Sequence, residues 1–228
     1  MSATSSSSSR RGAFIVFEGL DRCGKSTQVD RLVQRLDRDG HKARLQKFPD
    51  RTTAIGKMID AYLQSKAEMD DHAIHLLFAA NRWECAAAIR RDLENGITVI
   101  ADRYAFSGIA FSAAKGLPFE FCLQPDTALP LPDITLYLTL PPAVASQRSA
   151  FGVERYETVA IQTAVREQFG LVANEVKKRH GDGKWVEVSA EGSIEEVEER
   201  IWGLLEGMIS GGVDGRIGEL WVQSDESR

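Results

Sequence analysis

The sequence predicts an α/β fold in which a five-stranded parallel sheet is flanked by helices. Short apolar runs alternate with longer stretches of helical periodicity, which is the pattern of βαβ units. Several of these runs are almost entirely apolar, as expected for strands that helices cover on both faces. At 228 residues the chain is long enough for one well-packed domain and too short for two comfortable ones.

The expected elements follow one another along the chain. Strands are expected at 13–18, 43–48, 98–102, 134–139 and 185–189, where apolar residues run together. Helices are expected at 26–39, 53–64, 71–95, 105–115, 142–149, 161–179 and 194–209. The last helix has apolar residues at every third or fourth position, and glycines stand at 40 and 96, where two helices end.

The two ends of the chain differ in composition from the rest. Residues 1–11 are rich in serine and lack the apolar core of a secretory signal, so we expect a disordered tail. Residues 210–228 are rich in glycine and charge, so we expect a second loosely held end. Neither a linker nor an internal repeat interrupts the segment between them. A single domain is therefore expected over residues 12–209.

Composition excludes several classes of protein. The formal net charge of −5 argues against a general nucleic-acid or membrane-surface binder. No apolar run approaches the roughly 20 residues of a membrane span. The three cysteines lie far apart without metal or redox spacing, which favours a reducing compartment. We expect a cytoplasmic protein, with the nucleus left open as a second location.

The most informative motif lies in residues 13–27, where an apolar strand runs into Gly19-x4-Gly24-Lys25-Ser26. The glycines permit backbone angles that turn successive N–H groups inward, which makes a nest for phosphate at the start of the next helix. Lys25 brings a mobile charge to the β- and γ-phosphates, and the Ser26 hydroxyl can ligate Mg²⁺. This P-loop motif predicts a nucleoside triphosphate site.

Charged clusters follow three of the expected strands. They are Asp21-Arg22 within the P-loop, Phe48-Pro-Asp-Arg51, and Asp102-Arg103-Tyr104, while Arg82 lies in the helix expected at 71–95. Residues just after parallel strands meet at one edge of the sheet. A guanidinium suits phosphate oxygens bidentately, so Arg51, Arg82 and Arg103 predict a second phosphate site facing the first. For any one of these arginines the alternative is a surface ion pair.

Seven segments together resemble those of eukaryotic-type thymidylate kinase, a family of P-loop nucleoside monophosphate kinases. They are residues 19–27, 48–51, 75–84, 102–108, 129–133, 151–157 and 218–221. The likeness runs from about residue 11 to residue 221 in the family's order and spacing. The resemblance implies the P-loop NMP-kinase fold with a short mobile lid at about 149–157. It also implies Mg²⁺-dependent transfer of the γ-phosphoryl of ATP to dTMP, giving dTDP for dTTP synthesis, by a homodimer.

The resemblance also implies a role for individual residues. ATP would be held by Gly19, Asp21, Arg22, Cys23, Gly24, Lys25, Ser26 and Thr27, with Arg148 against the adenine. The acceptor dTMP would be held by Asp21, Phe48, Arg51, Phe78, Arg82, Arg103, Gly108, Phe111, Tyr156 and Gln162. Among these, Phe78 would stack on the thymine, Tyr156 would disfavour a 2′-hydroxyl, and Gln162 would lie near the base. Catalysis would depend on Asp21, Arg22, Lys25 and Arg103, and the metal would lie at Ser26 and Asp102.

Several of these residues have a plainer interpretation. Phe78 alone would be assigned to the core, and Tyr156 could be a loop anchor. Asp102 resembles a metal-associated carboxylate, but it could instead orient Arg103 through an ion pair. Asp133, beside a strand start, fits a structural residue better than a ligand.

Two other functions are compatible with a P-loop in this context. A deoxynucleoside kinase would phosphorylate a 5′-hydroxyl and would need a carboxylate as base at that hydroxyl. A non-catalytic nucleotide-binding module or GTPase-type switch would need a guanine-reading Asn-Lys-x-Asp segment, which the sequence lacks. Transfer to a nucleotide phosphate needs no base, because that acceptor is already ionised.

Overall fold

The computed structural model describes residues 10–140, 155–156 and 158–222. Its centre is a parallel sheet of five strands in the order β2-β3-β1-β4-β5. The strands are β1 Phe14–Gly19, β2 Ala43–Lys47, β3 Thr98–Asp102, β4 Ile134–Thr139 and β5 Trp185–Ser189. The predicted α/β fold with a five-stranded parallel sheet is confirmed, and every strand lies within one residue of its expected bounds.

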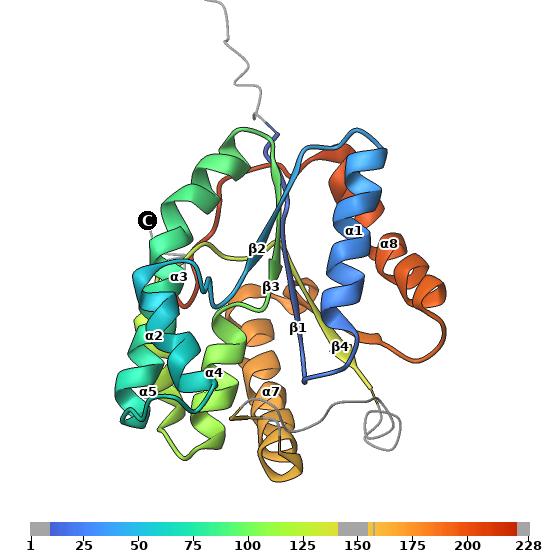
Figure 1. The fold of residues 1–228 in the computed structure, drawn as a ribbon. Helices are drawn as coiled ribbons and strands as arrows, with labels where there is room; N and C mark the ends of the chain where they lie inside the picture. Colours follow the sequence, from blue (N-terminus) through green and yellow to red (C-terminus); the bar gives the residue numbers. More distant parts are fainter. Residues whose placement is uncertain (1–9, 141–154, 157, 223–228) are drawn as a thin grey trace, which may run out of the picture.

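The helices also follow the expected order along the chain (Figure 1). They are α1 Lys25–Arg38, α2 Ala54–Leu63, α3 Asp71–Glu94, α4 Ala105–Ala114, α5 Phe119–Leu123, α7 Val159–His180 and α8 Ile194–Gly211. The expected helix at 142–149 lies outside the described residues. Sequence analysis missed α5 and the 3-10 turns Gln124–Asp126 and Asp182–Lys184, which are too short to show a helical period.

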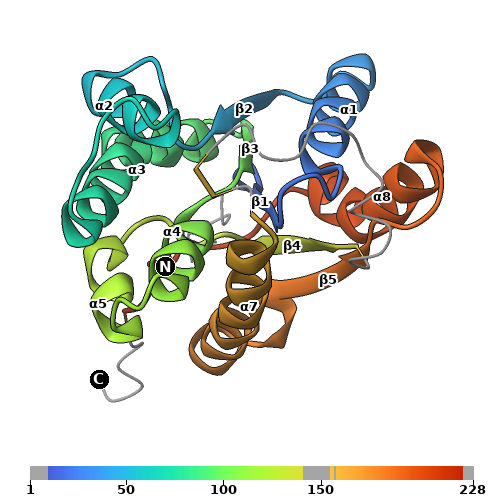
Figure 2. The same cartoon turned by 60° about the horizontal axis from the view of Figure 1, so that its bottom comes forward.

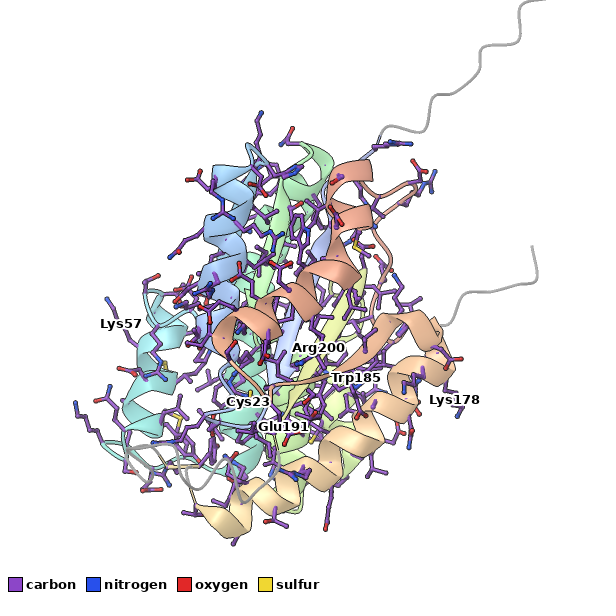
Figure 3. The ribbon with its side chains drawn as sticks, turned by 90° about the vertical axis from the view of Figure 1, so that its right-hand side faces the viewer. Cys23, Lys57, Lys178, Trp185, Glu191 and Arg200 are labelled. Atoms are coloured by element: carbon purple, nitrogen blue, oxygen red, sulfur yellow. The ribbon has the colours of Figure 1, made fainter. Side chains whose placement is uncertain are left out.

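The helices form a layer on each face of the sheet (Figures 1 and 2). Helices α1 and α8 cover one face, and α3, α4 and α7 cover the other. Each layer encloses its own hydrophobic core, because the strands are buried on both faces. The turn from β5 into α8 is held by Arg200, whose guanidinium donates to the carbonyl oxygens of Ser189 and Glu191 (Figure 3).

The central strand β1 determines where the functional side chains gather. Its residues 14–17 have no exposed surface, and it pairs with β3 on one side and β4 on the other. In the register, Asp102 lies beside Phe17 of β1 and beside Lys47 of β2. The carboxyl ends of β1, β2 and β3 therefore meet at one edge of the sheet, where ligands of such sheets bind.

The expected disordered tail over residues 1–11 is wrong at its inner end. Arg11 is buried and forms two hydrogen bonds of 2.7 Å with Asp133, and its backbone bridges to Val213. Asp133 also accepts from the Phe14 amide at 2.8 Å. Arg11 and Asp133 thus fix the entry to β1, which confirms the structural interpretation of Asp133. Sequence spacing did not reveal the pair because 122 positions separate the two residues.

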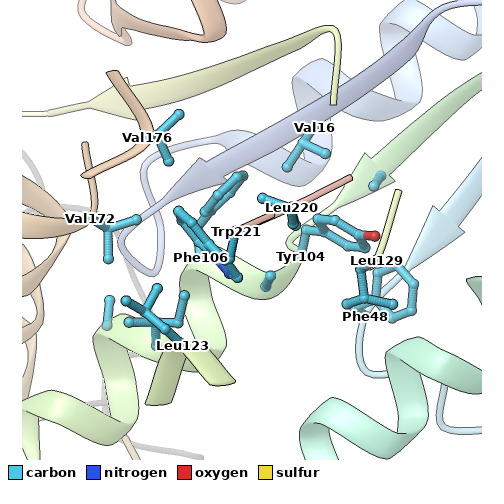
Figure 4. Packing of buried hydrophobic residues seen from close by; sticks show 14 of the residues in the cluster. Val16, Phe48, Tyr104, Phe106, Leu123, Leu129, Val172, Val176, Leu220 and Trp221 are labelled. Atoms are coloured by element: carbon cyan, nitrogen blue, oxygen red, sulfur yellow. The ribbon is translucent and has the colours of Figure 1, made fainter. Parts of the chain in front are cut away.

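The expected loose end over residues 210–228 is likewise wrong as far as residue 222. Leu220 has no exposed surface, and Trp221 packs edge-on against Phe106 of α4 (Figure 4). The backbone of Leu220 is tied to Ala128 and Leu129 by hydrogen bonds of 2.9 and 2.8 Å. Burying an aromatic ring and a leucine offsets the cost of ordering this glycine-rich segment. Among the described helices, none has the length and apolar character needed to cross a membrane.

Candidate active site

The P-loop joins β1 to α1 in a conformation that requires its two glycines. Gly19 has φ 148°, and a Cβ there would lie 2.8 Å from the Leu138 carbonyl oxygen. Gly24 has φ 90° and caps α1, whose first residue is Lys25. The free N–H groups and the positive end of α1 therefore face the mouth of the loop, where they suit a phosphate group.

Lys25, Ser26 and Asp102 meet at the start of α1. The Lys25 ammonium is 3.6 Å from one oxygen of Asp102, and the Ser26 hydroxyl donates to the other oxygen at 2.8 Å. The alternative pairing of Asp102 with Arg103 is not what the structure shows, because Arg103 pairs with Asp21. A serine hydroxyl beside a carboxylate presents the hard oxygen donors that Mg²⁺ prefers.

These oxygens fit a magnesium ion that takes its remaining ligands from water and phosphate. Within the described residues, no group of three or more Asp, Glu, His or Cys side chains could hold a metal by itself. Mg²⁺ in phosphoryl-transfer sites is normally bound through one or two protein groups together with substrate phosphates. The donor set of Ser26 and Asp102 matches that mode of binding.

Two hollows adjoin at this edge of the sheet. The first, the P-loop groove, is lined by Arg22, Gly24, Lys25, Ser26, Thr27, Asp102 and residues of β2. The second, the aromatic pocket, is lined by Leu63, Phe78, Arg82, Tyr104, Ser107, Gly108, Phe111, Ser112 and Tyr156. Both are also lined by Asp21, Phe48, Pro49, Arg51 and Arg103. Ligands in the two hollows would meet at these shared residues.

Arg103 is the best-anchored of the shared residues. Its guanidinium pairs with Asp21 and donates to the Gly19 carbonyl oxygen at 3.2 Å and to the Ser107 hydroxyl at 2.9 Å. Its φ of 67° is unusual for a residue with a side chain, as is the φ of 66° at Arg22. Each such residue costs on the order of 1 kcal/mol or more, which the surrounding structure must offset.

Glu18, which sequence analysis missed, supports Arg103 from beneath. Its carboxylate is fully buried and accepts from the amides of Tyr104 and Ser107 at 3.0 and 2.9 Å and from the Ser107 hydroxyl at 2.5 Å. Burial raises the pKa of Glu18, although the Arg103 charge opposes that rise. Glu18 caps the start of α4, which has no cap of its own. A polar residue inside an apolar strand was the available signal.

Arg51 lies on the opposite side of the shared region. Its guanidinium donates to Asp60 of α2 at 2.7 Å, and its side chain is 41% exposed. The Arg51–Asp60 pair lies at the surface, which is the alternative that sequence analysis gave for any one of these arginines. Arg51 still borders both hollows. An exposed ion pair is worth little, so a phosphate group can displace Asp60 at small cost.

Arg82 lies at the far end of the aromatic pocket. It forms a buried bidentate pair with Asp126, with distances of 2.8 and 2.7 Å. A Cβ on Gly108 would come within 2.8 Å of the guanidinium nitrogens, so glycine is required for Arg82 to lie across α4. Sequence analysis predicted Arg82 and Gly108 at this pocket and missed Asp126, which lies 44 residues from Arg82.

Three aromatic side chains predicted for the acceptor surround the middle of the pocket. Phe78 lines it from α3 and also packs, partly buried, against the core cluster of Ile59, Tyr62 and Leu63, so both interpretations of this residue hold in part. Phe111 and Tyr156 pack together with ring centroids 5.3 Å apart. Tyr156 is 9% exposed and packs on helices α2 and α4 as well, so it also anchors its own segment.

Gln162 is placed differently from its expected position near the base. It is absent from the residues that line the aromatic pocket. Its amide nitrogen donates to Asp21 at 2.7 Å and to the Tyr156 carbonyl at 3.0 Å, and its amide oxygen accepts from the Asp21 backbone at 3.1 Å. Gln162 thus joins the P-loop to the residue that walls the pocket. Gln162 lies in the first turn of α7, which begins three residues after Tyr156, and it can therefore contact Asp21 and Tyr156 at once.

His75 and Ser112 form a further pair that sequence analysis missed. His75 is fully buried in α3, and its Nδ1 lies 2.8 Å from the hydroxyl of Ser112, which lines the aromatic pocket. Burial, together with the nearby Arg82 and Lys115 charges, lowers the pKa of His75 to about 4. The imidazole is therefore neutral near pH 7.

The remaining predicted residues divide into two groups. Arg148 and the expected lid at 149–157 lie outside the described residues, apart from residues 155 and 156. Cys23 is 2% exposed and packs in the core beneath the P-loop, so only its backbone can face a phosphate. The other two cysteines are also buried and unpaired.

Comparison with known proteins identifies the family of the chain. The family model described as thymidylate kinase matches residues 17–201. Thymidylate kinases of Danio rerio and Homo sapiens are each 46% identical to the chain, over 94% and 93% of its length and over 99% and 98% of their own. The chain belongs to the thymidylate kinase family. A solved thymidylate kinase from Candida albicans superposes with a TM-score of 0.81 at 36% identity, covering 93% of this chain and 99% of its own.

The resemblance stated from the sequence is therefore confirmed, as is the P-loop NMP-kinase fold. For a thymidylate kinase the junction of the two hollows is the informative feature. Such an enzyme must bring two nucleotide phosphates end to end, and arginines at the junction offset the charge of both.

Proposed function

We propose that this protein transfers the γ-phosphoryl group of ATP to dTMP, giving dTDP in the synthesis of dTTP. The observation that carries the proposal is that the P-loop groove and the aromatic pocket share Arg51 and Arg103. A nucleoside monophosphate in the pocket would place its phosphate against these two guanidinium groups, facing the end of a nucleoside triphosphate in the groove. Membership of the thymidylate kinase family supports thymine as the base that the aromatic pocket would hold.

The chemistry at the junction favours a phosphate acceptor over a hydroxyl acceptor. A deoxynucleoside kinase would need a carboxylate free to take a proton from the 5′-hydroxyl. The carboxylate at the junction, Asp21, is instead paired with Arg103 and accepts from Gln162. An ionised phosphate needs no base, so positioning and charge neutralisation suffice. Asp21 then remains available to a sugar hydroxyl of the acceptor.

The donor side is assigned to the P-loop. Lys25 would offset charge on the β- and γ-phosphates, and the amides of residues 19–27 would hold their oxygens. Ser26 and Asp102 would hold Mg²⁺, which supplies positive charge to the phosphate oxygens when bound. Arg22 would stabilise the phosphoryl group as it moves, because it lines the groove together with Lys25 and Ser26. Arg148 is proposed to lie against the adenine.

The acceptor side is assigned from the phosphate outward. Arg51 and Arg103 would bind the phosphate of dTMP, and Phe48 and Tyr156 would enclose the sugar. The base would stack on Phe78, and Arg82 would donate to one of its carbonyl oxygens. Gly108 and Phe111 would complete the pocket. The homodimer that the resemblance implies and the cytoplasmic location expected from the cysteine pattern both stay predictions.

The test of this function is ADP release coupled to a dye or to NADH, with ATP and one of several acceptors. We expect turnover with dTMP and none above background with thymidine or without acceptor. dUMP should be used less well than dTMP by roughly five- to tenfold, because one buried methyl is worth about 1 kcal/mol. Comparable turnover on AMP or GMP would contradict the assignment of the pocket, and turnover on thymidine would favour a deoxynucleoside kinase.

A further inference from the structure

Tyr156 is one of the residues that line the aromatic pocket. Its ring packs on Phe111, and the Phe111 ring lies 5.4 Å from the guanidinium carbon of Arg103 at the shared end of the pocket. Arg82 and Ser112 mark the far end. A nucleotide with its phosphate at Arg103 and its base at Arg82 would therefore present its sugar to Tyr156. This step depends on the proposed function.

Lys115 lies behind Tyr156 and outside the pocket. It follows the last residue of α4, and its ammonium donates to Asp71 of α3 at 2.5 Å and to the Tyr156 hydroxyl at 3.3 Å. The same ammonium is 5.5 Å from the ring centroid of Tyr156 and 5.7 Å from that of Tyr62. We call Lys115, Asp71, Tyr62 and Tyr156 the Lys115 cluster. It joins helices α2, α3 and α4 to the segment that carries Tyr156.

The cluster uses the hydrogen-bonding capacity of the Tyr156 hydroxyl. The oxygen accepts from Lys115, and its proton is donated to the Tyr62 hydroxyl at 3.4 Å. Burial raises the pKa of Tyr156, so the hydroxyl stays protonated and has one proton to donate. A ligand hydroxyl that reached Tyr156 would find the tyrosine proton already donated, so Tyr156 could not replace the donor that water supplies to that hydroxyl.

The backbone of Tyr156 is fixed independently of Lys115. The Arg155 amide donates to the Leu63 carbonyl at 3.1 Å, and Gln162 donates to the Tyr156 carbonyl at 3.0 Å. The Arg155 guanidinium stacks on the Tyr62 ring at 4.2 Å and pairs with Glu68. With the main chain held at both sides, the contact with Lys115 controls the position of the ring tip.

We propose that Lys115, held by Asp71, is a positioning residue for sugar selectivity. It keeps the Tyr156 ring rigid and its hydroxyl occupied, so that the wall admits a 2′-deoxyribose and rejects a 2′-hydroxyl. A free tyrosine ring would move aside for the extra oxygen or would bond to it. The selectivity for deoxynucleotides would then depend on a lysine that touches neither substrate.

The test compares dTMP with 5-methyluridine 5′-monophosphate, which differs from dTMP only by the 2′-hydroxyl. Lys115→Met keeps the length of the side chain and removes its charge and its donors. We expect the ratio of kcat/KM for dTMP to kcat/KM for the ribonucleotide to fall about tenfold, which corresponds to about 1.4 kcal/mol. The change should arise mainly from a lower KM for the ribonucleotide, while kcat with dTMP stays within about threefold. A purely structural role would lower both activities together.

Three further variants make the result decisive. Asp71→Asn frees Lys115 without removing it and should lower the ratio in the same direction, and Lys115→Arg should largely restore it. Lys57→Met is the matched control, because Lys57 lies on the outer surface of α2 (Figure 3). A ratio unchanged within twofold in folded Lys115→Met and Asp71→Asn would overturn the proposal. If Lys115→Met does not fold, a ratio unchanged within twofold in Asp71→Asn alone would overturn the proposal. Failure of the unmodified protein to use dTMP would instead overturn the proposed function.

Discussion

At the residue scale, the two arginines proposed to act on the reacting phosphates share an unusual backbone. Arg22 and Arg103 have φ values of 66° and 67°. Residues with a Cβ adopt this conformation at a cost, and it persists only where surrounding contacts enforce it. At Arg103 those contacts are visible as bonds to Asp21, Gly19 and Ser107. Both residues line the P-loop groove, so the strained backbone lies where the proposed reaction would take place.

Arg22→Gly tests the catalytic part of this account with little damage to the loop. Glycine adopts φ near 66° without strain, so the substitution removes the guanidinium and relieves the backbone. A contact made mainly in the transition state should lower kcat and kcat/KM together. We expect kcat to fall on the order of 10³-fold, as for other arginines that contact the moving phosphoryl group.

The measurement is single-turnover kinetics beside equilibrium binding. Dissociation constants of ATP and dTMP should change only a few-fold, and the melting temperature should not fall. Near-normal chemistry with weakened ATP binding would assign Arg22 to support of the loop instead of catalysis.

At the element scale, helices α3 and α4 make the far half of the aromatic pocket through buried polar pairs. Arg82 of α3 meets Asp126, and His75 of α3 meets Ser112 of α4. A buried ion pair contributes little net stability, yet loss of one partner leaves an uncompensated charge at a cost of about 3–5 kcal/mol. These pairs therefore fix the orientation of the side chains that face the ligand.

His75 predicts a pH dependence of stability. Its pKa is near 6.5 in the unfolded chain and about 4 in the folded one, so between these values the unfolded state binds more protons. Its contribution is complete above pH 6.5 and is lost as the pH falls towards 4. Compared with His75→Gln, the unmodified protein should lose on the order of 3 kcal/mol more of its free energy of unfolding over this range.

Urea denaturation at half-unit pH intervals from 4 to 7 checks this expectation for the two proteins. In the difference between the two free energies of unfolding, the contribution of carboxylates that titrate in both proteins cancels. If the free energy of unfolding fell with pH by the same amount in both proteins, His75 would be protonated without penalty in the folded state.

Strands and strand-end residues could be predicted from the sequence, whereas side-chain partners that lie far apart in the chain could not. Strands such as Thr98–Asp102 were predicted to the residue because an uninterrupted apolar run has clear ends. The P-loop and the arginines at strand ends were also predicted, since topology alone brings strand ends together. Glu18 and Asp126 were missed because their partners lie 44 to 89 residues away. Local spacing carries no signal for such contacts.

At the scale of the whole molecule, the position of β1 accounts for the site. It lies in the middle of the sheet, between β3 and β4, so the P-loop at its end lies beside the end of β3, with the end of β2 one strand further away. Gln162 of α7 reaches the same loop through Asp21. The C-terminal segment completes the core under α4 through Leu220 and Trp221 (Figure 4). The sheet order, rather than any one motif, therefore brings Arg51 and Arg103 to the junction of the P-loop groove and the aromatic pocket.

The central claim is that the groove binds the donor and the aromatic pocket binds the acceptor, with Arg103 on the acceptor side. Isothermal titration of dTMP and of a non-hydrolysable ATP analogue into Lys25→Ala and Arg103→Ala tests it most directly. We expect Arg103→Ala to lose about 2–3 kcal/mol of dTMP affinity, the value of charged hydrogen bonds to a phosphate, and to keep the ATP analogue within a few-fold. Lys25→Ala should show the reverse. Loss of the ATP analogue with unchanged dTMP binding in Arg103→Ala would contradict the account.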